Sequence, residues 1–137
     1  MPHSYEKNGA AIYAESFATI RAEADLARFT PAEELVVVRM IHAAGMIGLA
    51  PFVRFTADFA DAARAALEGG ASVLCDARMV SEGITRARLP ADNQVICTLQ
   101  DPQVRKMAEA AGNTRSAVAL ELWRPYLDGA VVAIGNA

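Results

Sequence analysis

The sequence has few lysines, cysteines and histidines, and these shortages exclude several classes of protein. Of 13 basic residues only Lys7 and Lys106 are lysines, and the net charge of -3 argues against a general nucleic-acid binder. The two cysteines, Cys75 and Cys97, each lie within a short apolar run. We therefore expect reduced, packed thiols of the kind found in cytosolic proteins, and no disulfide framework.

Long apolar runs and known cofactor motifs are also missing. No segment approaches the roughly 20 apolar residues of a membrane span, and the N-terminus lacks the pattern of a signal peptide. The sequence contains no glycine-rich dinucleotide fingerprint, no Walker loop and no histidine cluster at metal-binding spacing. We therefore predict a cytoplasmic protein with no membrane segment, no metal and no cofactor.

The first third of the chain is predicted to be helical, from residues 5 to 24 and again from residue 30. Thr30 can cap the second helix, Pro31 suits its first position, and Glu33 completes a capping box. The stretch 35–38 is β-branched and could form a buried strand, but the capping residues and the apolar spacing favour a helix that ends at Gly45.

After residue 57 the pattern changes to helices that alternate with short strands. A helix over 57–67 is expected to end at Gly69-Gly70. Strands are expected at 71–75, 94–99 and 130–134. Between the last two strands we expect two helices, one that begins at Asp101-Pro102 and one that runs from Asn113 or Thr114 to near Pro125. The 137 residues suit one domain. We predict a single α/β domain over 1–137, with a parallel β-sheet flanked by helices in a Rossmann-like three-layer arrangement, preceded by an N-terminal helical segment.

In such sheets, ligands bind outside the carboxyl ends of the strands. The residues expected there are polar or glycine: Asp76, Arg78, Ser81, Thr85, Arg86, Thr98, Gln100, Asp101, Gly135 and Asn136. Arg115 and Ser116 open a predicted helix, where free backbone N–H groups favour an anion. Eleven of the basic residues are arginines, and arginine can bind a carboxylate through two parallel hydrogen bonds. A GC-rich coding sequence is an alternative explanation for the many arginines. The pattern predicts an arginine-rimmed pocket for a ligand with several carboxylates.

His42, in the string RMIHAAGM, is the strongest candidate for chemistry. It falls in the last turn of the predicted helix from Thr30, where the macrodipole favours an imidazolium, and it shares a face with Arg39. The alternative is a core or capping histidine that is satisfied by a carbonyl.

Four strings, RMIHAAGM, DARMVSEGITR, GNTRSA and VVAIGNA, resemble the precorrin-8X methylmutase family of cobalamin biosynthesis in their order and spacing. Family members continue beyond the last string, so the chain resembles their N-terminal and central part, and we expect a truncation at the C-terminus. The resemblance implies a homodimeric isomerase that needs no added cofactor. It would move a methyl group from C-11 to C-12 of precorrin-8X, a polycarboxylate tetrapyrrole, to give hydrogenobyrinic acid.

The resemblance also implies roles for individual residues. His42 would protonate a ring nitrogen and so promote a sigmatropic methyl shift. Arg39 could bind a peripheral carboxylate. Contacts to the substrate would come from Ser16, Thr85, Arg86, Arg115 and Ser116. For Thr85, a capping or turn role fits nearly as well. Ser16 is the weaker candidate, because hydroxyl groups on helices often face solvent.

Two other functions fit the same residues. The pocket could hold a corrinoid without converting it, as a carrier module. Alternatively, an unrelated α/β domain could use residues 112–116 as an anion nest for a phosphorylated metabolite.

Overall fold

The computed structural model describes residues 3–136 and comprises two compact units, Met1–Asp61 and Ala62–Ala137. Each unit has buried apolar residues of its own. The prediction of a single α/β domain over 1–137 stays a prediction, because two compact units can belong to one cooperative domain.

The first unit is helical, as predicted. It contains α1 (Gly9–Glu23), α2 (Pro31–Ala44), the 3-10 helix η1 (Ile47–Phe52) and the start of α3 (Phe59–Glu68). The expected start of the first helix near residue 5 is wrong, because the Asn8 side chain caps α1 by accepting hydrogen bonds from the backbone N–H groups of Ala10 and Ala11.

The second helix begins and ends where the sequence predicts. The Thr30 side chain accepts from the Glu33 N–H, and the Glu33 carboxylate accepts from the Thr30 N–H at 3.0 Å, which completes the capping box. At the other end Gly45 adopts a φ of 66°, a left-handed conformation that suits glycine. The alternative of a strand over 35–38 is wrong.

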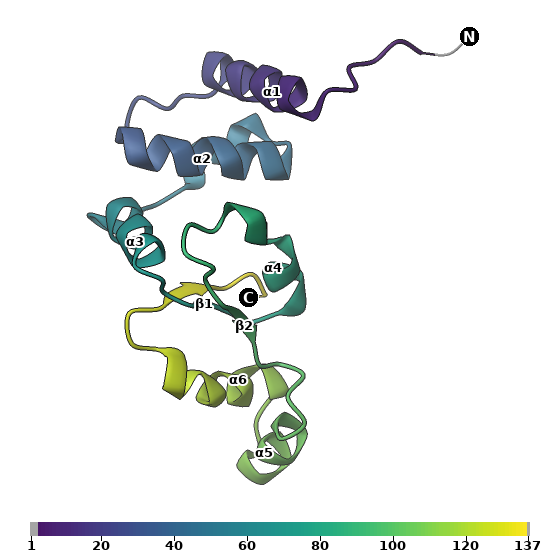
Figure 1. The fold of residues 1–137 in the computed structure, drawn as a ribbon, viewed down its shortest axis with the longest axis vertical. Helices are drawn as coiled ribbons and strands as arrows, with labels where there is room; N and C mark the ends of the chain where they lie inside the picture. Colours follow the sequence, from purple (N-terminus) through teal and green to yellow (C-terminus); the bar gives the residue numbers. More distant parts are fainter. Residues whose placement is uncertain (1–2, 137) are drawn as a thin grey trace. The chain divides into compact units, whose positions relative to one another are not determined.

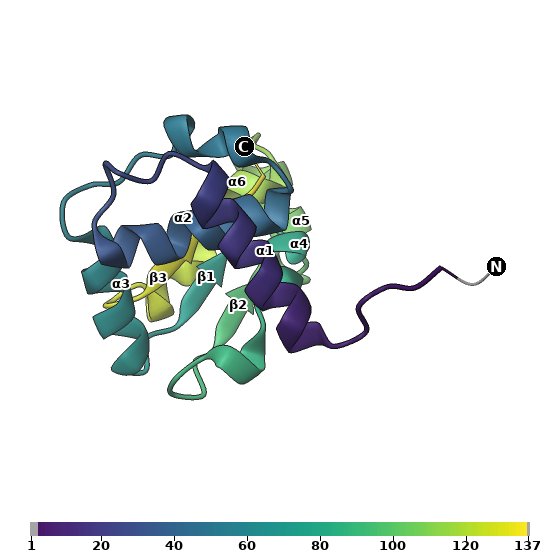
Figure 2. The same cartoon turned by 90° about the horizontal axis from the view of Figure 1, so that it is seen from above.

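The core of this unit lies between α1 and α2. Ile20 on α1 is 4% exposed, and Val37, Val38 and Ile41 on α2 are almost completely buried. Figures 1 and 2 show α1 lying across α2. Burying each of these side chains contributes roughly 1.5–3 kcal/mol, so the crossing of the two helices is firmly set.

The second unit contains a three-stranded parallel sheet, which confirms the predicted α/β class. Its strands are β1 (Val73–Cys75), β2 (Val95–Cys97) and β3 (Val131–Ala133), in the order β2-β1-β3. All three are shorter than expected, by two or three residues. The three residues of the central strand β1 are buried.

Helices connect the strands and flank the sheet. The first connection holds α4 (Arg78–Gly83) and η2 (Arg86–Arg88), which the sequence had not predicted. The second holds α5 (Val104–Ala111), α6 (Arg115–Ala119) and η3 (Leu120–Tyr126). In Figure 1, α4 lies on one side of the strands and α6 on the other. The prediction of one helix that runs to near Pro125 is wrong in part, because α6 ends at Ala119 and a 3-10 helix follows it.

The two cysteines are free thiols, as expected. They are register partners on β1 and β2, and burial raises the pKa of the Cys75 thiol, which keeps it protonated and unreactive. Within residues 3–136, no helix combines the length and the hydrophobicity that crossing a membrane requires.

Asn93 makes a buried polar link whose loss should destabilise the second unit. It is 6% exposed, and its side-chain N–H groups donate to the carbonyl oxygens of Leu67 at 2.8 Å and Ala71 at 2.7 Å. We expect Asn93→Ala to lower the free energy of unfolding by about 2 kcal/mol, because two partly buried carbonyl groups lose their donors. Urea unfolding measures this change, and Gln94→Ala, at an exposed neighbour, is the control. Equal midpoints for the two variants would contradict the role of Asn93.

Candidate functional site

His42 lies in the last turn of α2 and is half-buried against α1. Its Nδ1 atom is 2.7 Å from the Ser16 Oγ atom, so the partner of this nitrogen is a hydroxyl group and not the carbonyl considered above. Ser16 is also half-buried and belongs to the middle of α1. The crossing of the two helices therefore brings together two residues that are 26 positions apart in the sequence.

Two aromatic rings of α1 also contact the imidazole. The Tyr13 ring centroid is 4.9 Å from that of His42, and the Phe17 ring meets the imidazole edge-on at 5.3 Å. The Arg39 guanidinium lies 5.2 Å from the Phe17 ring centroid, within the range of a cation–π interaction. As the sequence predicts, Arg39 and His42 share a face of α2, and this face contacts α1.

A pocket of about 400 Å³ opens beside the imidazole. Most of its lining is apolar, with His42 and a few polar groups among the walls: Ile12, Glu15, Ser16, Thr19, Ile20, Ile41, His42, Gly45 and Ile47. No arginine belongs to this lining. The pocket therefore suits an apolar part of a ligand.

In the second unit, the carboxyl end of the sheet carries Asp76, as predicted. Its carboxylate accepts hydrogen bonds from the backbone N–H groups of Gly135 at 2.9 Å and Asn136 at 3.0 Å. The bond from Gly135 is the main cause that lowers the pKa of Asp76. A side chain at Gly135 would collide with Val80, since an added Cβ would lie 2.4 Å from a Val80 methyl carbon. This close approach explains the glycine after β3.

The arginines that follow β1 contact neighbouring groups of the protein. Arg86 donates to the carbonyl oxygens of Ser81 and Ile84, so its guanidinium braces the turn after α4. Arg78 lies 3.5 Å from the Gln100 side-chain oxygen and 3.9 Å from a Glu82 carboxylate oxygen. Thr85 is exposed in the same turn. A contact between Thr85 or Arg86 and a ligand stays a prediction.

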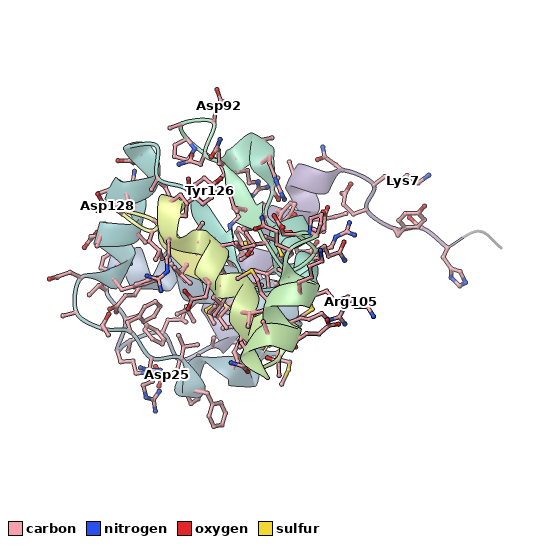
Figure 3. The ribbon with its side chains drawn as sticks, turned by 90° about the horizontal axis from the view of Figure 1, so that it is seen from below. Lys7, Asp25, Asp92, Arg105, Tyr126 and Asp128 are labelled. Atoms are coloured by element: carbon pink, nitrogen blue, oxygen red, sulfur yellow. The ribbon has the colours of Figure 1, made fainter. Side chains whose placement is uncertain are left out.

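Arg115 and Ser116 form the exposed first turn of α6. Arg115 lines a second pocket, of about 460 Å³, together with Arg105 and Asn113. Figure 3 shows the Arg105 side chain on the outer side of α5, and its guanidinium is 3.4 Å from the Glu109 carboxylate. No described contact joins Arg115 to Arg86, and the predicted arginine rim stays a prediction.

Three residues at the His42 site were missed by the sequence analysis. Tyr13 and Phe17 contact the imidazole ring and Glu15 lines the pocket. Tyr13, Ser16 and Phe17 are three and four positions apart, which places them on one face of a helix. That spacing could have indicated that Ser16 shares its face with two aromatic residues.

Among residues 3–136, no three histidine, cysteine, aspartate or glutamate side chains lie close enough together to hold a metal ion.

Comparison with known proteins identifies relatives for almost the whole chain. The family model of precorrin-8X methylmutase matches residues 11–137. The chain is 56% identical over 135 residues to a precorrin-8X methylmutase of Sinorhizobium sp., covering 98% of this chain and 64% of the relative. It is 57% identical to that of Pseudomonas aeruginosa, covering 97% of this chain and 64% of that protein.

A solved structure of a precorrin-8X methylmutase has a similar fold. The precorrin-8X methylmutase of Thermus thermophilus superimposes with a TM-score of 0.79 at 40% identity, over 94% of this chain and 63% of that one. The chain thus spans somewhat less than two thirds of the length of these relatives.

The hydrogen bonds to Asp76 make a prediction about pH. Because the pKa of the folded state is lowered, their stabilising contribution is fully present above the ordinary value of 3.8 and is lost as the pH falls through the lower, folded value. In NMR spectra, we expect the amide proton chemical shifts of Gly135 and Asn136 to change together as Asp76 is protonated, with a midpoint below pH 3.8.

Asp76→Asn should abolish this titration, whereas Asp128→Asn, at an exposed position, should leave it intact. A midpoint at or above 3.8 for the wild-type amides would contradict the assignment.

Proposed function

The chain belongs to the precorrin-8X methylmutase family, and on that premise we propose that it is an isomerase of cobalamin biosynthesis. Its reaction is the migration of a methyl group from C-11 to C-12 of precorrin-8X, which gives hydrogenobyrinic acid. Support comes from the identity of 56–57% to two named methylmutases over nearly the whole chain.

The observation that carries the proposal is the environment of His42. Its Nδ1 atom is held by Ser16, which leaves Nε2 as the nitrogen that can exchange a proton with a ligand. A largely apolar pocket of about 400 Å³ adjoins the ring, and an apolar wall suits the face or methyl-bearing edge of a tetrapyrrole.

In the proposed reaction His42 acts as a general acid. Its imidazolium protonates a ring nitrogen of the substrate, which draws electrons from the ring and promotes a suprafacial sigmatropic shift of the methyl group. An isomerisation consumes no proton, so the proton returns to His42 after the shift. Positioned acid catalysis of this kind supplies roughly 10²–10⁴-fold in rate. The reaction proposed here uses no added cofactor.

The peripheral carboxylates of the substrate need cationic and hydroxyl partners. We assign this role to Arg39, Arg86 and Arg115, with hydroxyl contacts from Thr85 and Ser116. Each charged hydrogen bond contributes roughly 1.5–3 kcal/mol, so a few of them outweigh the net charge of -3. The homodimer and the cytoplasmic location expected from the sequence belong to the same proposal.

The decisive variant is His42→Ala, which should bind substrate without converting it, because the acid is lost while the binding groups remain. Conversion is followed by the visible absorption spectrum after precorrin-8X is added. His3→Ala is the matched control, since it removes the other histidine of the chain from an exposed segment.

Each variant is tested in the chain and in a chimera in which the chain replaces the matching 135 residues of the Sinorhizobium relative. The chimera also contains the part of the relative that lies outside the matched residues. We expect the wild-type chimera and its His3→Ala variant to convert precorrin-8X. Unchanged turnover in His42→Ala would contradict the assignment of the acid. Binding without conversion in the wild-type chimera would favour the carrier module instead.

Arg39 should contribute to substrate binding. In the chimera, we expect Arg39→Gln to raise KM by roughly 10- to 100-fold, the equivalent of one lost charged hydrogen bond. Arg124→Gln, at an exposed arginine that pairs with Glu121, is the control. An unchanged KM in Arg39→Gln would exclude Arg39 from the binding groups.

A further inference from the structure

We propose that Ser16 is a positioning residue that holds His42 in one tautomer, with the proton on Nδ1. In this arrangement the Ser16 oxygen accepts a hydrogen bond from Nδ1–H, and Nε2 is the nitrogen that gains and loses a proton. The contact between Ser16 and Nδ1 comes from the packing of the two helices, whereas the direction of the bond and the catalytic use of Nε2 rest on the proposed function.

The geometry of the pair is that of a short, shielded hydrogen bond. The distance of 2.7 Å between Ser16 Oγ and His42 Nδ1 is at the short end of the range for such bonds. Both residues are half-buried, so competition from water is reduced. A serine hydroxyl can accept two hydrogen bonds and donate one, so it suits either protonation state of the ring.

The direction of the bond follows from the charge cycle of the imidazole. When His42 is an imidazolium both nitrogens are donors, so Ser16 must accept from Nδ1–H. When Nε2 then gives its proton to a ring nitrogen of the substrate, the neutral ring keeps its Nδ1–H, and the bond to Ser16 remains as it was. After the methyl shift the product returns that proton to Nε2. The cycle therefore closes without rotation of the hydroxyl, as expected of a preorganised site.

The aromatic neighbours restrict rotation of the imidazole ring. Tyr13 lies beside the imidazole with an interplanar angle of 35°, and Phe17 meets it at 87°. Both rings belong to α1, which also carries Ser16 and is anchored by the buried Ile20. A flip of the imidazole would put Cδ2 in place of Nδ1 and break the Ser16 bond, and the turning ring would have to push past the two aromatic rings.

Thr19 offers a comparison within the same helix. It lies less than one helical turn beyond Ser16 and lines the same pocket, yet among the described hydrogen bonds none joins it to His42. A hydroxyl in the pocket is therefore not sufficient, and the position of Ser16 opposite Nδ1 is what matters.

The test is a long-range ¹H–¹⁵N NMR spectrum of His42 in the chain, recorded without ligand at alkaline pH, where the ring is neutral. We expect the Nδ1–H tautomer in the wild type, a shift toward Nε2–H in Ser16→Ala, and recovery of the wild-type pattern in Ser16→Thr. Thr19→Val should give the wild-type pattern, and His3 serves as an exposed reference in every sample. An Nε2–H tautomer in the wild type, or an unchanged tautomer in Ser16→Ala, would overturn the proposal.

Kinetics of the chimera give a second readout. Loss of one hydrogen bond, worth about 1.4 kcal/mol, should lower kcat about tenfold in Ser16→Ala and leave KM unchanged. A rise in KM with unchanged kcat would identify Ser16 as a substrate contact and overturn the positioning role. If no chimera turns over but the tautomer responds to Ser16→Ala, the proposed function fails and the positioning of His42 stands.

Discussion

The packing of α1 across α2 is the interaction on which the candidate site depends. Ile20 on one helix and Val37, Val38 and Ile41 on the other exclude water from the crossing. Because the two helices are rigid, burying these side chains also fixes the groups beside them. Ser16 then faces Nδ1 of His42, two aromatic rings flank the imidazole, and a pocket forms next to it. The apolar contacts supply the free energy, and the polar contact supplies the orientation.

Local features of the fold could be predicted, because the residues that determine them are neighbours in the sequence. The capping box at Thr30 and the left-handed Gly45 define α2 within two residues at either end, and short β-branched runs indicate the three strands. Contacts between distant segments could not be predicted in the same way. The bond from Ser16 to His42 spans 26 positions and that from Gly135 to Asp76 spans 59, so both depend on how elements pack.

The arginines show a related limit of sequence reasoning. Composition indicates how many guanidinium groups exist, but not which partners they choose. Arg86 bonds to two backbone carbonyls of its own turn, and Arg105 pairs with Glu109 one helical turn away. At the carboxyl end of the sheet, the group that stands out is instead the Asp76 carboxylate, which two backbone N–H groups hold in its ionised form. It orders the glycine turn after β3, so its role is to shape the edge of the sheet.

A crystal structure of the chimera with bound hydrogenobyrinic acid would be the most direct test of His42 as the acid. The proposed reaction requires that Nε2 lies within about 2.6–3.2 Å of a ring nitrogen, the reach of a general acid. It also requires that Nδ1 keeps its bond to Ser16 while the tetrapyrrole occupies the site. A product bound with its ring nitrogens out of reach of His42, or with Nδ1 turned toward the ligand, would contradict the proposed reaction.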